Sequence, residues 1–329
     1  MNPVVTPFTK QTGIKYPIIC GAMYPCSNPE LVAATSEAGG IGIIQPLSMI
    51  FVYGYEFRKG IEKIKSLTQK PFGMNVIVEK NAKIYEDRMK GWVDIALQEG
   101  CRFFITALGN PAWVIEKVKP KGAIIYHDVI NKKWADKVVP LGIDGLICVN
   151  NRAGGHAGNQ DPKTLFDELK TLQLPLICAG GIGDENDFKT ALQMGYAGVQ
   201  LGTRFIATKE CAAHEDYKLA ILNANEEDIV QTERVTGVPL SVINTPYVQR
   251  IGLKVDPISK MLFKYRKSKH LIRMAYNLKA IWSMKRSALK GLSTKDYWQA
   301  GKSVRGIKKI ETVSAIVERF VRALAPLQP

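Results

Sequence analysis

The sequence predicts a (β/α)8 TIM barrel with a basic, mainly helical insertion near its C-terminal end. Eight short apolar runs alternate with amphipathic stretches over about 200 residues, the pattern of repeated parallel βα units. Glycine-rich loops follow the sixth, seventh and eighth of these runs. Between Arg250 and Lys309 there are 17 Lys and Arg but two acidic residues, so this stretch carries the whole net charge of +15.

The expected strands are the apolar runs, in chain order Pro17–Cys20, Ile41–Ile44, Phe72–Val76, Arg102–Ile105, Ala123–Tyr126, Gly145–Cys148, 175–178 and Ala197–Gln200. The expected helices lie between them, at 28–38, 54–68, 86–98, 112–118, 132–139, 163–172 and 184–194. Asn28 is the expected N-cap of the first helix, because Pro29 follows it at a position where proline is favoured. Gly39 and Gly40 are expected to end that helix.

An open, doubly wound sheet is the alternative architecture. Such a sheet favours a Gly-x-Gly-x-x-Gly loop after an early strand, with an acidic residue about twenty positions later. The segments Gly40-Ile41-Gly42 and Gly181-Ile182-Gly183 both lack the third glycine. The eight βα units within about 200 residues therefore favour the closed barrel over the open sheet.

Composition places the chain among globular proteins. It has 329 residues, 46% of them hydrophobic, and no run approaches the ~18 apolar residues of a membrane span. The start of the chain lacks the pattern of a secretory signal, and none of the six cysteines forms a Cys-x-x-Cys pair. We therefore expect a cytoplasmic protein with buried, reduced thiols. The charge break predicts a barrel from residues 1–214 and 311–329, with an insertion at 215–310.

The loops after the seventh and eighth strands are candidates for phosphate binding. Barrel enzymes often bind phosphate there, and Gly180-Gly181 and Gly202-Thr203 occupy these places. Glycine lets backbone N–H groups approach phosphate oxygens closely. The alternative is that these glycines only allow tight turns. The loop after the sixth strand, residues 149–158, reads VNNRAGGHAG and contains His156.

Five ordered segments carry a resemblance to a known family. They are the opening 17–23 with 38–42, Phe72–Asn75, Ala153–Gly158, Ala179–Ile182 and Gln200–Phe205. Together they resemble the nitronate monooxygenase family, formerly called 2-nitropropane dioxygenases, which shares its opening with the flavin-type enoyl-acyl carrier protein reductases. Residues 236–239 and 297–301 are similar to later family segments, so the resemblance spans nearly the whole chain.

The resemblance implies bound FMN at the barrel mouth, with His156 as the catalytic residue. The positions carried over as cofactor contacts are Met23, which would line the flavin ring, and Asn75, Gly154, Gly180, Gly181, Gln200, Gly202 and Thr203. The sequence departs from the family pattern in two places: Val149 stands where glutamine is usual, and Arg152 where an acidic residue is usual. Asn150 or Asn151 is expected to replace the lost flavin contact.

His156 suits proton transfer, because imidazole titrates near neutrality. The resemblance then implies oxidation of small alkyl nitronates with O2, with His156 as base or anion stabiliser. One alternative is an FMN-dependent enoyl-acyl carrier protein reductase that uses NADH or NADPH, and another is a non-catalytic basic scaffold for an acidic partner. His127 ends the fifth strand and is expected to face the mouth, where with Asp128 it could contact the substrate; the alternative is a packed histidine beside a helix-capping Asp128. His214 and His270 are interpreted as surface or packing residues. No spacing of His and Cys suggests a metal site.

The basic insertion contains a stretch without Pro or Gly, Met261–Lys290, in which apolar residues recur at helical spacing. It is interpreted as a helical lid whose apolar stripe covers the barrel. The alternatives are docking of an acidic partner, such as an acyl carrier protein or a CoA phosphate, and contact with an anionic lipid surface. Specific nucleic-acid binding is the least favoured, because no recognised module is present. A homodimer is compatible with the sequence, which does not define the oligomeric state.

Overall fold

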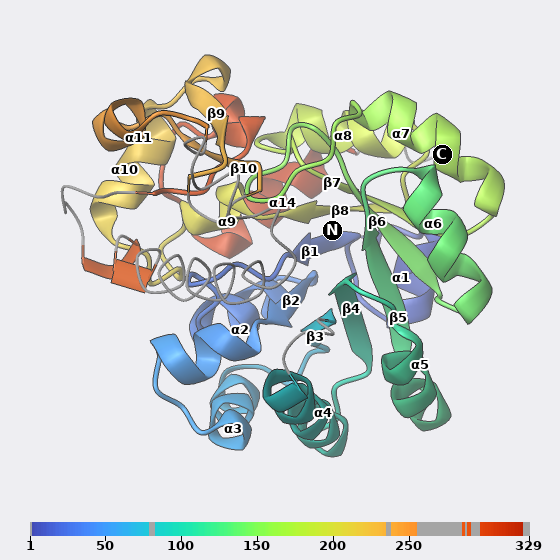
Figure 1. The fold of residues 1–329 in the computed structure, drawn as a ribbon. Helices are drawn as coiled ribbons and strands as arrows, with labels where there is room; N and C mark the ends of the chain where they lie inside the picture. The colour runs from blue at the N-terminus through green and yellow to red at the C-terminus, as the bar shows by residue number, and fades with distance from the viewer. Residues whose placement is uncertain are drawn as a thin grey trace, which may run out of the picture.

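The computed structural model describes residues 2–78, 83–234, 238–254, 285–286, 288–290 and 297–324. Eight parallel strands close into a barrel in sequence order (Figure 1). They are β1 (Ile18–Cys20), β2 (Ile41–Ile44), β3 (Gly73–Val78), β4 (Phe103–Leu108), β5 (Ile124–Val129), β6 (Gly145–Val149), β7 (Leu176–Ala179) and β8 (Gly198–Leu201). The predicted (β/α)8 barrel is therefore confirmed.

Helices surround this barrel. The ring consists of α2 (Pro29–Glu37), α3 (Phe57–Leu67), α4 (Lys83–Gln98), α5 (Ala112–Val118), α6 (Lys132–Val138), α7 (Pro162–Leu169), α8 (Glu185–Gln193) and α14 (Val313–Arg322). The last helix packs against both α2 and α8, and the Phe188 and Phe320 rings stack at 5.5 Å. The final segment of the chain thus closes the gap that β8 leaves in the ring. Asn28 is at the N-cap of α2, but its side chain does not cap the helix.

One end of the barrel is closed by aromatic side chains. Helix α1 (Pro7–Thr12) carries Phe8, whose ring lies 5.6 Å from the rings of both Phe103 and Tyr126. These rings belong to the same buried cluster as Ile19 and Ile147, on the inward faces of their strands. Since this plug fills the N-terminal end of the strands, access from solvent is to the C-terminal end, where barrel enzymes place their chemistry.

Further elements lie between β8 and α14. They are α9 (Thr203–Ile206), α10 (Glu215–Asn223), α11 (Pro246–Ile251) and an antiparallel pair, β9 (Ile229–Thr232) and β10 (Leu240–Ile243). Figure 1 shows β9, β10 and α11 together on one side of the barrel mouth. The two-stranded sheet was not expected from the sequence. The central part of the predicted helical lid, 261–284, lies outside the described residues, and the predicted boundaries at 214 and 311 stay predictions.

Short helical turns complete the described secondary structure. A π-helical turn, η1 (Ser48–Val52), precedes α3, and the 3-10 turns are η2 (Lys119–Lys121), η3 (Val139–Leu141), η4 (Lys170–Leu172), η5 (Glu226–Asp228) and η6 (Lys302–Gly306). All six cysteines are buried and free, as expected. Among the helices that the structure describes, none is long and apolar enough to cross a bilayer.

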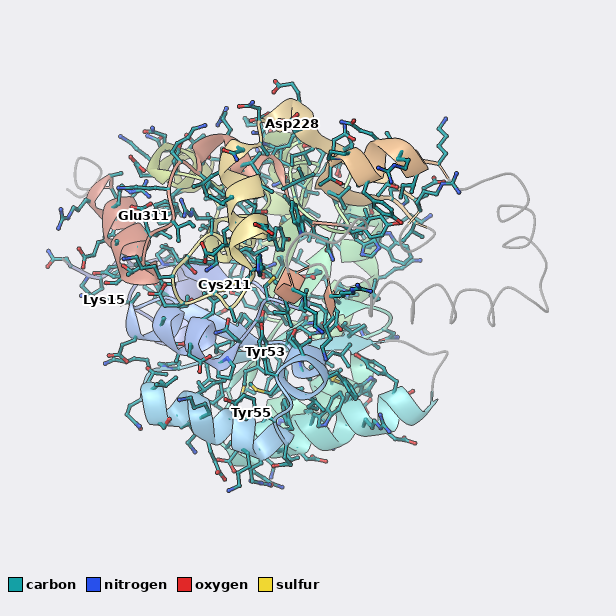
Figure 2. All side chains as sticks on the ribbon, turned by 90° about the vertical axis from the view of Figure 1, so that its left-hand side faces the viewer. Lys15, Tyr53, Tyr55, Cys211, Asp228 and Glu311 are labelled. Atoms are coloured by element: carbon teal, nitrogen blue, oxygen red, sulfur yellow. The ribbon has the colours of Figure 1, made fainter. Side chains whose placement is uncertain are left out.

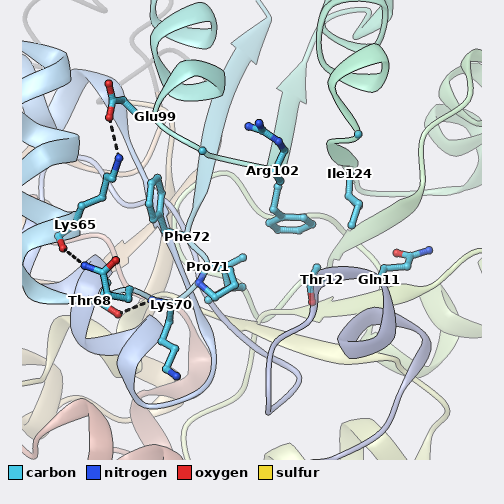
Figure 3. Close-up of a pocket in the computed structure, with 15 residues that line it drawn as sticks. Gln11, Thr12, Lys65, Thr68, Lys70, Pro71, Phe72, Glu99, Arg102 and Ile124 are labelled. Carbon is cyan, nitrogen blue, oxygen red and sulfur yellow. Dashed lines mark hydrogen bonds and ion pairs between the residues drawn. The ribbon is translucent and has the colours of Figure 1, made fainter.

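A pocket of about 400 Å³ opens at the closed end of the barrel (Figure 3). Gln11, Phe72, Arg102 and Ile124 are among its lining residues, which come from α1 and from the starts of the strands. This is the end opposite to the glycine-rich loops. Residues at this end of a TIM barrel mainly serve stability, so we do not place the chemistry there.

Close approach of α2 to the barrel depends on Gly42. A Cβ atom at Gly42 would lie 2.6 Å from the Cα of Val32 and closer still to its carbonyl oxygen. We therefore expect Gly42→Ala to destabilise the fold by about 1–3 kcal/mol, the usual cost of overpacking a core. Gly91→Ala is the matched control, because Gly91 lies on the exposed face of α4 with nothing within 4 Å of an added Cβ.

Urea unfolding of both variants measures the effect. The control should be stabilised by roughly 0.5–1 kcal/mol, since alanine is the better helix former. Equal stability of Gly42→Ala and the wild type would show that α2 can move away from β2 without cost.

Candidate active site

Asn150 joins the loops that follow β6 and β7. It is fully buried; its Nδ2 donates to the carbonyl of Gly180 at 3.0 Å, and its Oδ1 accepts from the backbone N–H of Arg152 at 2.8 Å. Asn151 is half-buried, and its backbone N–H donates to the carbonyl of Gln160 at 2.8 Å. Of the two asparagines that the sequence offered, Asn150 therefore organises the loops.

The glycines of these loops are needed for close packing. Gly180 and Gly181 have φ values of 120° and 85°, which side chains rarely adopt. A Cβ at Gly180 would lie 2.5 Å from Oδ1 of Asn150, and one at Gly181 would lie 2.6 Å from Nε of Arg152. The glycines therefore do allow tight turns, which was the alternative to phosphate binding. Each turn also leaves room for a neighbouring side chain.

The same cluster includes the loop after β8 and the segment 299–303. The backbone N–H of Gly301 donates to Oγ1 of Thr203 at 3.0 Å, and a Cβ at Gly154 would lie 2.8 Å from the nitrogen of Gly301. The predicted residues Gly154, Gly180, Gly181 and Thr203 are therefore brought together at the C-terminal ends of β6, β7 and β8.

Strand β10 pairs with the loop that carries His156, residues 150–158, which we call the β6 loop. Gly155 and Ser241 exchange two backbone hydrogen bonds, at 3.2 and 2.7 Å. On the same edge of β10, opposite to β9, the N–H of Ile243 donates to the carbonyl of Trp298, in the segment before Gly301, at 2.9 Å. The β6 loop is thus held in place by β10 as well as by the barrel.

His156 directly follows this pairing and has an exposed side chain. The surrounding protein nevertheless desolvates its ring, which lowers the pKa of His156 below its ordinary value of 6.5 because burial disfavours the charged imidazolium. At neutral pH the ring is therefore neutral and has a lone pair that can accept a proton.

Gln200 reaches the mouth from the inward face of β8. It pairs in register with Ile19 and Ala179, both in the cluster inside the barrel. Its Oε1 is buried and has no hydrogen-bond partner in the described part of the chain. Met23 lies nearby, since a Cβ at Gly202 would be 3.5 Å from its Sδ. An unpaired buried acceptor of this kind usually indicates a missing ligand or solvent.

Asn75 lies on β3, and strands β1 and β2 separate it from Gln200 on β8. Its side chain is 8% exposed, and it follows Gly73 on the inward face, where an added Cβ would touch Ile43 and Phe103. Asn75 makes none of the loop contacts above within the described residues. It therefore faces the same mouth without belonging to the cluster around Gly180.

The loop after β1, which bears Met23, is anchored from the outside of the barrel. The hydroxyl of Tyr53 donates to the carbonyl of Pro25 at 2.8 Å, and Sγ of Cys211 lies 3.6 Å from the carbonyl oxygen of Cys26. Tyr53 and Cys211 are labelled in Figure 2. Asn28 also donates to the carbonyl of Glu210 at 2.9 Å. The position of Met23 is therefore well defined.

Arg152, where the family usually has an acidic residue, makes an ion pair that sequence reasoning missed. Its guanidinium pairs with Glu226 of η5, which also lies 3.5 Å from Arg305. Arg305 in turn binds Asp187 of α8 at 2.8 Å. These partners are far apart in sequence and follow no motif, so nothing in the sequence links them. The charge of Arg152 lies beside Gly181 and is balanced by Glu226.

The expectation that His127 faces the mouth is wrong. Its neighbours Ile125 and Val129 belong to the cluster between the strands and the helices, and Nδ1 of His127 lies 2.7 Å from Oγ1 of Thr106 in that layer. Burial lowers the pKa of His127 to about 4, so the ring is neutral. Asp128, the next residue, is the one that faces inward. His214 serves as the N-cap of α10, and His270 lies outside the described residues.

Comparison with known proteins places the chain in a family. The family model described as nitronate monooxygenase matches residues 6–323. The chain belongs to the nitronate monooxygenase family. This confirms the resemblance drawn from the motifs, and it makes the chain an oxidoreductase enzyme.

Relatives within and around the nitronate monooxygenase family differ in their stated activities. A (3aS,4S,5R,7aS)-5-hydroxy-7a-methyl-1-oxo-octahydro-1H-indene-4-carboxyl-CoA dehydrogenase of Mycobacterium tuberculosis is 33% identical over 250 residues, 75% of this chain and 68% of the relative. A nitronate monooxygenase of Paraburkholderia phytofirmans is 30% identical over 268 residues, 68% of this chain and 72% of that protein. The structure of FabK from Thermotoga maritima aligns with a TM-score of 0.80 and 28% identity, covering 98% of this chain and 97% of FabK.

The joining role of Asn150 can be tested by Asn150→Ala, with Asn151→Ala as the matched control. Removing the Asn150 amide leaves the Arg152 N–H and the Gly180 carbonyl without their partner, so we expect a loss of about 1–3 kcal/mol in unfolding free energy. The control should change stability by less than ~0.5 kcal/mol, as is usual for surface positions. Chemical denaturation measures both, and equal effects of the two substitutions would contradict the assigned role.

Proposed function

We propose that the protein is an FMN-dependent oxidoreductase that oxidises small alkyl nitronates with O2. What supports this proposal is that the loop bearing His156 and the Gly180-Gly181 and Gly202-Thr203 loops follow three consecutive strands, β6, β7 and β8, of a closed barrel of this family. One part of the mouth offers groups for a phosphate, and the other offers a neutral imidazole.

The residues present fit FMN. Outside the regular elements, the backbone hydrogen bonds of the described residues include none donated by the N–H groups of Gly181 or Gly202, which leaves these donors for phosphate oxygens. Gln200 supplies a buried unpaired acceptor, which suits the N–H donor on the pyrimidine edge of a flavin. Met23, from the loop after β1, and Asn75, from β3, are the side chains that we propose to contact the ring system. When bound, the flavin supplies the electron transfer, which no side chain of this site provides.

His156 is the group that we propose to act on the substrate. Its neutral ring can take the proton from the carbon of a nitroalkane, which gives the nitronate and an imidazolium. A nitronate that binds already ionised can instead accept a hydrogen bond from the ring N–H of His156. His156 directly follows the bridge between Gly155 and Ser241, and we propose that the substrate carbon binds beside this bridge. Small ligands are the expected substrates for such a mouth.

Oxidation of an acyl-CoA thioester is a second candidate function. It is favoured by the activity for which the M. tuberculosis relative is named, and a Rhodococcus jostii relative with the same name is 31% identical over 252 residues. The carbon next to a thioester carbonyl is also acidic, so His156 would have the same task. Because the structure is also similar to that of FabK, reduction of an enoyl thioester with NADH or NADPH is tested as well. These relatives are enzymes, so they give no support to a non-catalytic scaffold.

The cofactor proposal predicts a yellow protein from which heat releases FMN and no FAD, because the two glycine loops fit a terminal phosphate. Mass spectrometry of the released flavin measures this. Anaerobic mixing of the holoenzyme with ethyl nitronate, with an acyl-CoA, and with NADH or NADPH then identifies the reductant by bleaching of the flavin absorbance. A protein that takes up no flavin after reconstitution would refute the site assignment.

The role of His156 predicts that His156→Ala retains bound FMN but loses about 10²–10⁴-fold in turnover, the usual effect of removing a general base. His214→Ala is the control, because this histidine caps α10 and lies beside Asp216 of the same helix. Because the pKa of His156 lies below 6.5, the ring becomes protonated, and so inactive as a base, only at lower pH. Turnover of the wild type should therefore persist to pH values under 6.5 before it falls. Wild-type rates in His156→Ala would remove this residue from the mechanism.

A further inference from the structure

We propose that Asp128 is a second catalytic residue of this mouth, whose protonated carboxyl group donates a hydrogen bond to the anionic oxygen of the substrate. This inference rests on the proposed function, because it assumes a nitronate or a thioester carbanion. Both species carry their negative charge on oxygen, at the nitro group or at the thioester carbonyl. A fixed donor aimed at such an oxygen is among the strongest contributions that a site can make.

The alternation of side chains along β5 directs Asp128 into the barrel. Tyr126, two residues earlier, belongs to the cluster inside the barrel, and Asp128 pairs in register with Ile147 of that cluster. On β4 the inward positions are Phe103 and Ile105. By the same alternation Ala107 is the next inward residue, and it lies at the level of Asp128. Asp128 lies one residue before the end of β5, so its carboxyl group faces the open end.

The β6 loop crosses the end of β5 and brings His156 to the same side. A Cβ at Gly158, two residues after His156, would lie 3.3 Å from the Cβ of Ile130 and would also touch the carbonyl of Val149. Ile130 is two residues after Asp128. The base and the carboxyl group are therefore on adjoining parts of one rim, which is the arrangement that a substrate held between them requires.

Nothing in the described residues gives Asp128 a structural role. Its Oδ1 is buried and has no hydrogen-bond partner there, and no ion pair of the described residues includes it. The titratable groups around it are His127, which points away from the mouth, Cys148 on the outward face of β6, and His156 in the loop above. A buried polar group without a partner costs stability, so its presence calls for a ligand.

The surroundings also keep Asp128 in the form that donates. Burial raises the pKa of its carboxyl group to about 7, because desolvation disfavours the anion and no cation offsets it. The group is therefore protonated below neutrality. Since the proton stays on Asp128 throughout, the residue changes the energy of the substrate anion without taking part in the electron balance.

Three variants of the holoenzyme test the proposal. Asp128→Leu removes the donor, Asp128→Asn keeps a donor that cannot ionise, and Asp136→Asn makes the same change on the outer surface of α6, where Asp136 binds Lys132 at 2.6 Å. With ethyl nitronate or an acyl-CoA, we expect Asp128→Leu to lose about 10²–10³-fold in kcat, the typical effect of losing one such donor. Asp128→Asn should keep most of the turnover, and Asp136→Asn all of it.

The pH profile separates a donor from a structural residue. In the wild type, turnover should fall as the pH rises through about 7, because ionised Asp128 repels the substrate anion. Asp128→Asn should lack this alkaline decline and should also melt at a higher temperature than the wild type at pH 8, where the wild type holds a buried charge. Full turnover in Asp128→Leu, or an unchanged alkaline decline in Asp128→Asn, would overturn the proposal.

A measurement without turnover keeps the two proposals distinguishable. Carbon-13 NMR of protein labelled at the aspartate carboxyl groups, with Asp128→Asn for assignment, gives the titration of Asp128 with and without isobutyrate, a carboxylate with the shape of propane-2-nitronate. We expect a titration near 7 that isobutyrate moves to higher pH. A titration in the ordinary range near 4, or one that isobutyrate leaves unchanged, overturns the role of Asp128 even if nitronates are oxidised. Absence of turnover on every substrate contradicts the proposed function alone.

Discussion

Side chains alternate between the inside and the outside along each strand of the closed barrel, and this alternation decides which residues can reach the mouth. Every second residue of a strand points inward, and the plug around Phe8 and Tyr126 fills the inner space at one end. Inward residues at the other end have no such filling and line the mouth. Gln200, Asn75 and Asp128 are in this position, whereas His127, one residue away from Asp128, belongs to the layer beneath the helices.

Much of the fold could be predicted from the sequence, because eight apolar runs and the glycine-rich loops are local signals. The inward or outward direction of a strand residue could not, since barrel strands are buried on both faces and carry no polar alternation. His127 is the example: its place at the end of a strand was evident, but its side was not. The β9–β10 pair was missed because it stands outside the repeated βα units and because β9 is only partly buried, so it forms no apolar run. The partner of Arg152 was missed because Glu226 is 74 positions away.

The two candidate reactions require the same groups from the protein. A nitroalkane and an acyl thioester both acquire a carbanion whose charge moves to oxygen, so either substrate requires a base for the carbon and a donor for the oxygen. Family membership fixes the class of chemistry, and the relatives named for nitronates and for a CoA thioester show that this class is used on different molecules. The choice between them lies in the groups that surround the mouth.

The exchange of hydrogen bonds between Gly155 and Ser241 joins the β6 loop to the small β9–β10 sheet through an isolated bridge. The loop is therefore shared between two structural units, and it cannot shift without moving β10 as well. Amide hydrogen exchange at these two residues would report opening of the mouth directly. In evolutionary terms, changes in the segment between β8 and α14 alter the geometry around His156 while every barrel strand stays the same. Substrate range and barrel stability can then be selected almost independently.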